Sequence, residues 1–469
     1  MEGEITGHVF GGACKTVTYR IFRALFRLSM RGFFRRVEVQ GVSSIPATGP
    51  VLFVANHTNA FVDPLVVLTS IERRVTITAK STLAKNPFLA LLLRGFGVVL
   101  LHRAQDRAEG ARTAGNLGAL GRCVDVLREG GAVFLFPEGV SHSDSGMRPF
   151  KNGAARIVMG YLEDGEGPPL TIVPVGLHFG RKDRWRSEAV ALIGRPTDAR
   201  VVAGAAANAS AVTAELRRRV EELTANFGSA EERDVMTRAG WMMRYRVEGP
   251  EPLDRDPTFD ARAHVDLVHR LQRGARRLHE EDPALFDSLA SETNALAQEL
   301  EDLGVDPREV SLSMHVGRVA LFVVRELEIL MVGAPLALVG AVLHAAPYQV
   351  TRRLVRAMSE DEDHPASNAV FLSIPIFLLW WVVLDLVALL SGPGWFILAA
   401  AGVPFTGLLY LRYRDRGAGM RRRVRTFLLW RRRPELKSRL EQRLQAWQER
   451  LSEAEDILID LERRGVPDA

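Results

Sequence analysis

Three long apolar segments in the C-terminal half constrain this 469-residue chain more than any other feature. They cover residues 327–346, 369–390 and 394–411, and each approaches the ~20 apolar residues that a helix needs to cross a bilayer. Only residues 391–393 separate the last two segments. The sequence therefore predicts an integral membrane protein in which 369–390 and 394–411 form a tight helical hairpin.

Arginine carries most of the positive charge and is distributed unevenly around these segments. Arginines precede residue 327, lie between 347 and 368 and follow 411, whereas the 391–393 link has none. Because arginine-rich flanks usually face the cytoplasm, we expect both chain ends there and only the hairpin tip outside the cell membrane. Segment 327–346 then does not cross fully. Gly333 and Pro335 are expected to break it into a re-entrant or interfacial element.

The composition is that of a folded chain rather than a disordered or disulfide-rich one. Apolar residues make up 47% and charged residues 25%, with a formal net charge of +5. The arginine surplus fits anionic partners such as lipid headgroups, and it is equally what a GC-rich genome produces. No nucleic-acid-binding module accompanies it. Cys14 and Cys123 lack disulfide-scaffold or metal-ligand spacing, so no metal or other cofactor is expected.

Residues 1–36 contain a basic amphipathic stretch. Ile21, Leu25 and Leu28 share one face of a helix, and arginines are interleaved with them. The pattern favours a helix that lies in the membrane interface over one that packs in a core with its arginines in water.

Residues 37–200 alternate short apolar runs with helical stretches. Strands are expected at 37–41, 51–56, 75–80, 97–101, 132–137, 171–179 and 189–194, and helices at 64–71, 87–94, 106–129 and 152–163. Strands separated by helices predict an α/β domain with a mixed, mostly parallel sheet and flanking helices.

The remaining regions are expected to be helical. Residues 201–325 read as a helical region without a catalytic pattern, with helices near 231–247, 258–279 and 283–303. The membrane segments then occupy 326–411, and 412–469 combines an arginine-rich helix with a short heptad pattern. That pattern, within 436–461, either joins two copies of the chain or folds against the helical region, and we favour the second.

A histidine and an aspartate follow the second apolar strand. His57 ends that strand, and Asp63 comes six positions later. Transfer of an acyl group to an alcohol needs a base, and an imidazole backed by a carboxylate suits that role. Taken alone, His57 is more readily a core histidine, and Asp63 before Pro64 a helix cap.

Further polar residues follow other predicted strands. Arg103 follows the 97–101 strand, and Glu138 and Gly139 follow the 132–137 strand. Arg148 and Lys151 come just before the helix expected at 152–163. Because strand ends in an α/β sheet meet at one edge, these groups are expected near His57, where basic side chains can bind a phosphate.

In content and order these blocks resemble the glycerolipid acyltransferase family. Asn-His with a following Asp, a Gly-to-Arg block ending at Arg103, Phe-Pro-Glu-Gly at 136–139 and an apolar block around Pro174 occur in sequence. The resemblance implies that His57 is the general base and Asp63 its partner. It also implies that Arg103, Glu138 and Gly139 shape the site for the acceptor phosphate.

Two departures from the family pattern narrow the resemblance. Five residues separate His57 from Asp63, where most members have four, so part of 58–62 must be non-helical before a helix that starts at Pro64. Ser141 and His142 stand where the family usually has Arg-Ser, and Arg148 or Lys151 is expected to replace that arginine. Both changes are similar to fungal glycerol-3-phosphate/dihydroxyacetone-phosphate acyltransferases.

The resemblance implies an acyl transfer from acyl-CoA or acyl carrier protein to glycerol 3-phosphate or dihydroxyacetone phosphate, the first step of phospholipid synthesis. A second enzymatic interpretation keeps the chemistry but takes 1-acylglycerol 3-phosphate or another lysophospholipid as the acceptor. A third is a membrane scaffold without catalysis, which leaves His57, Asp63, Arg103 and Glu138 unexplained as a set.

Overall fold

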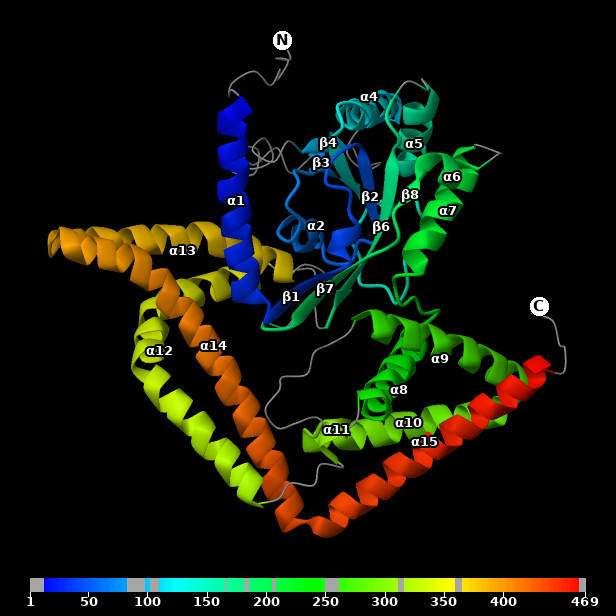
Figure 1. Ribbon diagram of the computed structural model, residues 1–469, viewed down its shortest axis with the longest axis vertical. Coiled ribbons are helices and arrows are strands. Elements are labelled where there is room, and N and C mark those ends of the chain that lie inside the picture. The colour runs from blue at the N-terminus through cyan, green and yellow to red at the C-terminus, as the bar shows by residue number, and fades with distance from the viewer. Residues whose placement is uncertain are drawn as a thin grey trace. The chain divides into compact units, whose positions relative to one another are not determined.

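The computed structural model describes residues 12–81, 98–101, 109–163, 165, 167–180, 185–204, 208–248, 261–310, 316–358 and 365–463 (Figure 1). The chain divides into two compact units, and each consists of two separate segments. The first contains Met1–Thr224 and Ala346–Val387, and the second contains Ala225–Ala345 and Ala388–Ala469.

The first unit is built around a mixed, mostly parallel β-sheet, as expected. Its strands are β1 (Arg36–Gln40), β2 (Val51–Ala55), β3 (Thr76–Lys80), β4 (Val99–Leu101), β5 (Ala132–Leu135), β6 (Thr171–Phe179), β7 (Glu188–Ile193) and β8 (Thr197–Asp198). They lie in the order β1-β7-β6-β2-β5-β3-β4, and β8 pairs with β6. Only the pairings of β6 with β7 and β8 are antiparallel.

Helices cover both faces of the sheet because its central strands are apolar on both sides. Phe53 and Ala55 of β2 belong to a core with α1 (Gly12–Phe33) and α2 (Val62–Leu68). Leu52 and Val54 face the opposite core, formed with α4 (Glu109–Arg128), α5 (Gly153–Glu163), α6 (Ala199–Ala203) and α7 (Ala209–Glu221). The two helical layers lie on either side of the strands in Figure 1.

The expected elements of this unit agree with the structure where they are described. All seven expected strands are present within about two residues of their expected bounds, and β8 was not anticipated. The helix expected at 87–94 lies outside the described residues. Cys123 of α4 is buried in the second core, and burial raises the pKa of its thiol to about 11.

Helix α1 packs its apolar face inward. Tyr19, Phe26 and Met30 are buried against the sheet and α2, while Arg27 donates to the carbonyl oxygen of Thr69 at 2.9 Å. This face of α1 therefore packs in the protein core, which was the alternative to a membrane-interface helix. A membrane-interface role for exposed residues of α1, such as Ile21, stays a prediction.

The second unit contains α8 (Ala230–Glu248), α9 (Ala261–Glu281), α10 (Pro283–Leu303), α11 (Pro307–Val310) and α15 (Pro434–Arg463), together with the first part of α12 (Val316–Met358) and all of α14 (Pro393–Arg432). The heptad residues Leu440, Leu444 and Trp447 of α15 are buried in one core with Leu296 and Leu300 of α10. Trp447 Nε1 also donates to Thr293 Oγ1 at 2.9 Å. The heptad pattern thus packs within the chain, which was the favoured alternative.

In the part of the chain that the structure describes, three helices are long and apolar enough to cross a membrane, within α12 (Val316–Met358), α13 (Pro365–Leu390) and α14 (Pro393–Arg432). The expected break at Gly333 and Pro335 is wrong, because α12 is helical through both. In the second unit α12 packs closely on α14. A Cβ on Gly340 would lie 2.2 Å from the carbonyl oxygen of Thr406, so glycine permits this approach of two backbones.

The packing of α7 against β6 predicts a strong effect of one added methyl group. A Cβ on Gly176 would lie 2.2 Å from the carbonyl oxygen of Leu223, whereas one on Gly118 of α4 would meet no atom within 4 Å. We expect Gly176→Ala to destabilise the protein by about 1–3 kcal/mol through overpacking. Gly118→Ala should stabilise it by ~0.5–1 kcal/mol, since alanine favours a helix. Thermal melts in detergent measure both variants, and equal melting temperatures would contradict this packing.

Candidate active site

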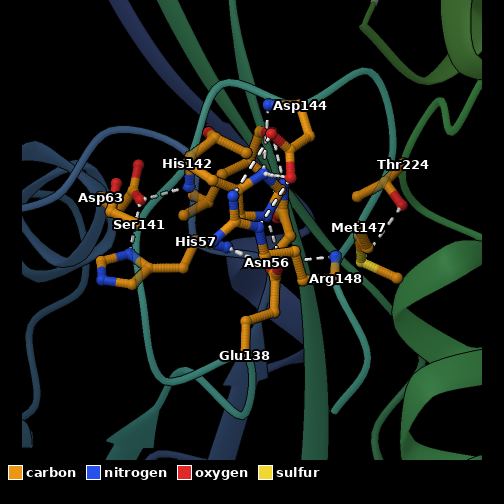
Figure 2. Close-up of polar contacts among 12 residues, drawn as sticks. Asn56, His57, Asp63, Glu138, Ser141, His142, Asp144, Met147, Arg148 and Thr224 are labelled. Carbon is orange, nitrogen blue, oxygen red and sulfur yellow. Dashed lines mark hydrogen bonds and ion pairs between the residues drawn. The ribbon is translucent and has the colours of Figure 1, made fainter. Parts of the chain in front are cut away.

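The site lies where two neighbouring strands end. β2 and β5 are adjacent and parallel, with Val54 opposite Leu135, so the residues after each strand emerge at the same edge of the sheet. Asn56 and His57 come after β2, and Phe136 to Gly139 come after β5. Figure 2 shows His57 and Glu138 from these two blocks close together, as the sequence predicted.

Asn56 fixes the start of the turn that carries His57. Its Nδ2 donates to the carbonyl oxygen of Leu177 at 3.1 Å, and the N–H of Leu177 donates to its Oδ1 at 2.7 Å. The Asn56 side chain thus continues the hydrogen bonding between β2 and β6 past the end of β2. A buried carboxamide with both functions satisfied holds the backbone next to His57 in one position.

His57 and Asp63 form a hydrogen-bonded pair. His57 Nδ1 lies 2.8 Å from Asp63 Oδ2, and the side chain of Asp63 is completely buried. A carboxylate only accepts hydrogen bonds, so Nδ1 carries the proton and Nε2 has a free lone pair. The same Oδ2 accepts the N–H groups of Thr58 and Asn59, each at 2.7 Å. The pair therefore holds the tautomer that a general base requires.

The turn between His57 and Asp63 is non-helical, as the five-residue spacing required. Ala60 has a positive φ of 41°, a conformation that costs a non-glycine residue about 1 kcal/mol or more. Helix α2 starts at Val62 rather than at Pro64. Asp63 is thus inside the first turn of α2, and the N-cap residue Phe61 makes no side-chain capping bond, so the helix-cap alternative for Asp63 is wrong.

The imidazole of His57 is supported from the other strand. Its ring stacks on Phe136, with 4.2 Å between ring centroids and 18° between planes. The side chain of His57 is 14% exposed, so the ring is held by its neighbours but not sealed from solvent.

Glu138 binds the protein backbone with both carboxylate oxygens. Oε1 accepts the N–H of His57 at 2.7 Å, and Oε2 accepts the N–H of Arg148 at 2.8 Å and contacts His142 Nε2. Its side chain has no exposed surface. These contacts join the two strand-end blocks. The carboxyl group in this position therefore supports the loop, and a role in shaping the acceptor site stays a prediction.

Ser141 and His142 also contact the turn, although the sequence alone assigned them no contacts. Ser141 Oγ accepts the N–H of Ala60 at 2.8 Å, and the N–H of His142 donates to the carbonyl oxygen of His57 at 3.2 Å. Their position in the sequence could have indicated these contacts. They directly follow the Phe-Pro-Glu-Gly block, and that block comes after β5, the strand next to β2.

The expected basic residues differ in their placement. The Lys151 side chain lies against Gly139, because a Cβ on Gly139 would lie 2.7 Å from Lys151 Nζ. The φ of +73° at Gly139 also favours glycine. Arg148 Nε donates to Asp144 Oδ2 at 2.6 Å near the surface. Arg103 lies outside the described residues. Among the residues that are described, no three His, Cys, Asp or Glu side chains are grouped to bind a metal ion.

Residues 36–178 match the family model described as Acyltransferase. The chain is 30% identical over 125 residues to a 1-acyl-sn-glycerol-3-phosphate acyltransferase of Brassica napus, covering 26% of this chain and 34% of that protein. It is 27% identical over 143 residues to one of Borreliella burgdorferi, covering 30% and 54%. It is 26% identical over 271 residues to glycerol-3-phosphate O-acyltransferase 1 of Saccharomyces cerevisiae, covering 40% and 35%. The chain thus spans between about a third and a half of these relatives, and the resemblance inferred from the four blocks is confirmed.

The geometry predicts distinct effects of replacing the two members of the pair. His57→Ala should lower the rate of acyl transfer by ~10²–10⁴-fold, the usual loss when a general base is removed. Asp63→Asn should also be severe, because an amide can donate to Nδ1 and so favour the wrong tautomer. Initial rates measure the effect, and thermal melts of both variants separate it from unfolding. Turnover near wild type in His57→Ala would refute the assignment.

Proposed function

We propose that this chain, which carries an acyltransferase-family domain over residues 36–178, is a membrane-bound O-acyltransferase. It would transfer a fatty acyl group from acyl-CoA or acyl carrier protein to a hydroxyl of a phosphorylated glycerol-type acceptor. The observation that carries the proposal is the His57–Asp63 pair, with Nδ1 bonded to a buried carboxylate and Nε2 available. A catalytically inert scaffold has no use for that arrangement.

In this mechanism the acceptor itself is the nucleophile. His57 Nε2 takes the hydroxyl proton as the acceptor oxygen attacks the thioester carbonyl, and Asp63 stabilises the imidazolium that forms. The tetrahedral intermediate then expels the thiolate, and the proton on Nε2 passes to that sulfur. The products are an ester and a free thiol, and His57 returns to its starting state without a covalent enzyme intermediate.

Basic side chains near the strand ends are the proposed partners of the acceptor phosphate. Lys151 is exposed above Gly139, and Arg148 is exposed beside Asp144. An arginine or lysine can contribute a charge-assisted hydrogen bond to phosphate. We assign this role to Lys151 first, because its ammonium group lies over the Phe-Pro-Glu-Gly block. Arg103 and Arg148 remain secondary candidates.

We further propose glycerol 3-phosphate or dihydroxyacetone phosphate as the acceptor. Support comes from the five-residue turn and from Ser141 and His142, which contact that turn in the structure. The relatives carry both kinds of name, 1-acyl-sn-glycerol-3-phosphate acyltransferase and glycerol-3-phosphate O-acyltransferase. A 1-acylglycerol 3-phosphate or another lysophospholipid is therefore the alternative acceptor.

Contacts within the first unit support the proposed membrane topology. Tyr348, near the end of α12, packs on Trp185 with 4.9 Å between ring centroids, and Ser367, at the start of α13, bonds to Asn59. The loop between α12 and α13 would thus share the cytoplasmic side of the acyltransferase domain. Among the described residues, none of the candidate spans lies between Thr224 and Val316. Both ends of α12 would then be cytoplasmic, so this unbroken helix would lie along the membrane, while α13 and α14 cross as a hairpin in the cell membrane.

The acceptor assignment is tested with purified protein in detergent and one acyl thioester. We expect kcat/KM for glycerol 3-phosphate or dihydroxyacetone phosphate to exceed that for 1-acylglycerol 3-phosphate by about tenfold or more, which is ~1.4 kcal/mol in transition-state binding. Lys151→Ala should raise the KM for the acceptor more than that for the thioester. A preference for 1-acylglycerol 3-phosphate would select the alternative acceptor.

The topology predicts which engineered cysteines an impermeant thiol reagent reaches on intact cells. Starting from a chain with Cys14 and Cys123 replaced, Ser391→Cys at the hairpin tip should be labelled. Met358→Cys at the end of α12 should be labelled only after the cells are permeabilised, although its side chain is exposed. Labelling of Met358→Cys on intact cells would mean that α12 crosses the membrane, and the two-span proposal would be abandoned.

A further inference from the structure

The first turns of the membrane helix α13 reach the turn that carries the candidate catalytic pair. Ser367 Oγ donates to the carbonyl oxygen of Asn59 at 2.8 Å and accepts the N–H of Val62 at 3.2 Å. Ser367 is buried, and it is separated from Asn59 by 308 positions in the sequence. One hydroxyl group thus bridges both ends of the segment that precedes α2.

This contact is one of several that hold the start of α13 against the acyltransferase unit. Ser29 Oγ of α1 lies 2.9 Å from the carbonyl oxygen of Val370 and 2.8 Å from Ser373 Oγ. The Phe371 ring packs edge-on against Phe61, with 5.5 Å between centroids. Val370 is fully buried in the same core as β2 and α2. The start of α13 is therefore packed into the acyltransferase unit and not merely adjacent to it.

The bridged segment is the one that sets the catalytic geometry. The N–H of Asn59 donates to Asp63 Oδ2, while its carbonyl oxygen accepts from Ser367. On the other flank Ser141 holds the N–H of Ala60, whose left-handed conformation needs external support. Two serines from different parts of the chain thus fix a strained turn, and that turn determines where the Asp63 carboxylate meets His57.

The position of Ser367 also sets the depth of the site. The apolar stretch of α13 runs from Ser367 to Leu390, 24 residues, which is about 36 Å of helix at ~1.5 Å per residue. A bilayer core is ~30 Å thick, so the stretch is long enough to cross it with its first residues, which pack in the acyltransferase unit, left at the membrane surface. His57 is two residues from Asn59, and their Cα atoms are within about 8 Å of each other.

We infer that Ser367 is a positioning residue that couples the membrane-spanning helix α13 to the catalytic turn. Its hydroxyl group holds the turn from Asn59 to Val62, and through it the His57–Asp63 pair, at the bilayer surface. There the acyl chain of a thioester or its lipid product can remain in the membrane during transfer. The inference rests on the proposed function for its catalytic consequence, whereas the coupling itself is independent of any activity.

The test compares Ser367→Ala with the matched control Ser373→Ala in the full-length protein. Both changes remove one hydroxyl group from α13, but within the described ranges of the chain the Ser373 hydroxyl group bonds to Ser29 of α1 and to its own helix, away from the catalytic turn. The Val62 N–H and the Asn59 carbonyl oxygen keep their 3.0 Å bond to each other in Ser367→Ala, but the turn loses the hydroxyl group that ties it to α13, so we expect kcat to fall about tenfold. The KM values for both substrates should stay within about twofold, because no substrate contact is removed. Ser373→Ala should stay within about twofold of wild type in all three constants.

A nearly isosteric variant separates hydrogen bonding from packing. Ser367→Cys keeps the shape of the side chain but replaces a hydroxyl group with a weak donor and acceptor. The inference requires kcat to fall in this variant as well. Full activity of Ser367→Cys would overturn it, since packing alone would then account for the alanine result.

Hydrogen–deuterium exchange provides a measurement that does not depend on turnover. We expect the peptide covering residues 57–63 to exchange about tenfold faster in Ser367→Ala than in Ser373→Ala, because the turn loses the hydroxyl group that bridges Asn59 and Val62 and opens more often. Equal exchange in the two variants would overturn the coupling. If wild-type protein transfers no acyl group to any acceptor but the exchange difference is present, the proposed function fails and the coupling stands.

Discussion

The Asp63 carboxylate is the group on which the rest of the site depends. It is completely buried, and a charge in that position is tolerated only when donors surround it. Its Oδ2 accepts from the backbone of Thr58 and Asn59 and from the imidazole of His57. These three bonds fold residues 58–62 into a turn, orient the histidine and select its tautomer. Loss of the carboxylate therefore removes a folding element and a catalytic element together.

A second buried carboxylate has the corresponding role in the neighbouring block. Glu138 accepts the N–H of His57 from the end of β2 and the N–H of Arg148 from its own loop. The two acids bind different parts of His57, since Asp63 bonds to the imidazole ring and Glu138 bonds to the main-chain N–H. Because β2 and β5 are adjacent parallel strands, their ends supply both acids without a long loop. The fold thus brings together residues 81 positions apart.

Periodicity and motif content were sufficient to predict the strands and the location of the site. The apolar runs indicated the strands, and the blocks around His57 and Glu138 indicated the edge of the sheet where they meet. Contacts to the backbone were not predictable in this way. The Glu138 carboxylate accepts hydrogen bonds from backbone N–H groups, which are present in nearly every residue and leave no signal in the sequence. The start of α2 at Val62 and the continuous α12 through Pro335 likewise depend on tertiary packing, which overrides the local signals for a cap or a break. The link from Ser367 to Asn59 joins segments too far apart in the sequence for any local pattern to reveal.

The separation between Ser367 and the catalytic turn has a consequence for how the protein is made. When the ribosome has completed the acyltransferase domain, the chain still lacks the hydroxyl group that bridges Asn59 and Val62. That group is supplied only after α12 has been synthesised and α13 has begun to enter the bilayer. A nascent or truncated chain would therefore carry the His57–Asp63 pair but lack one of the groups that hold its turn. Under the proposed function, membrane insertion would be the last step in assembling the site, and the newly made domain would turn over more slowly before it reaches the lipid.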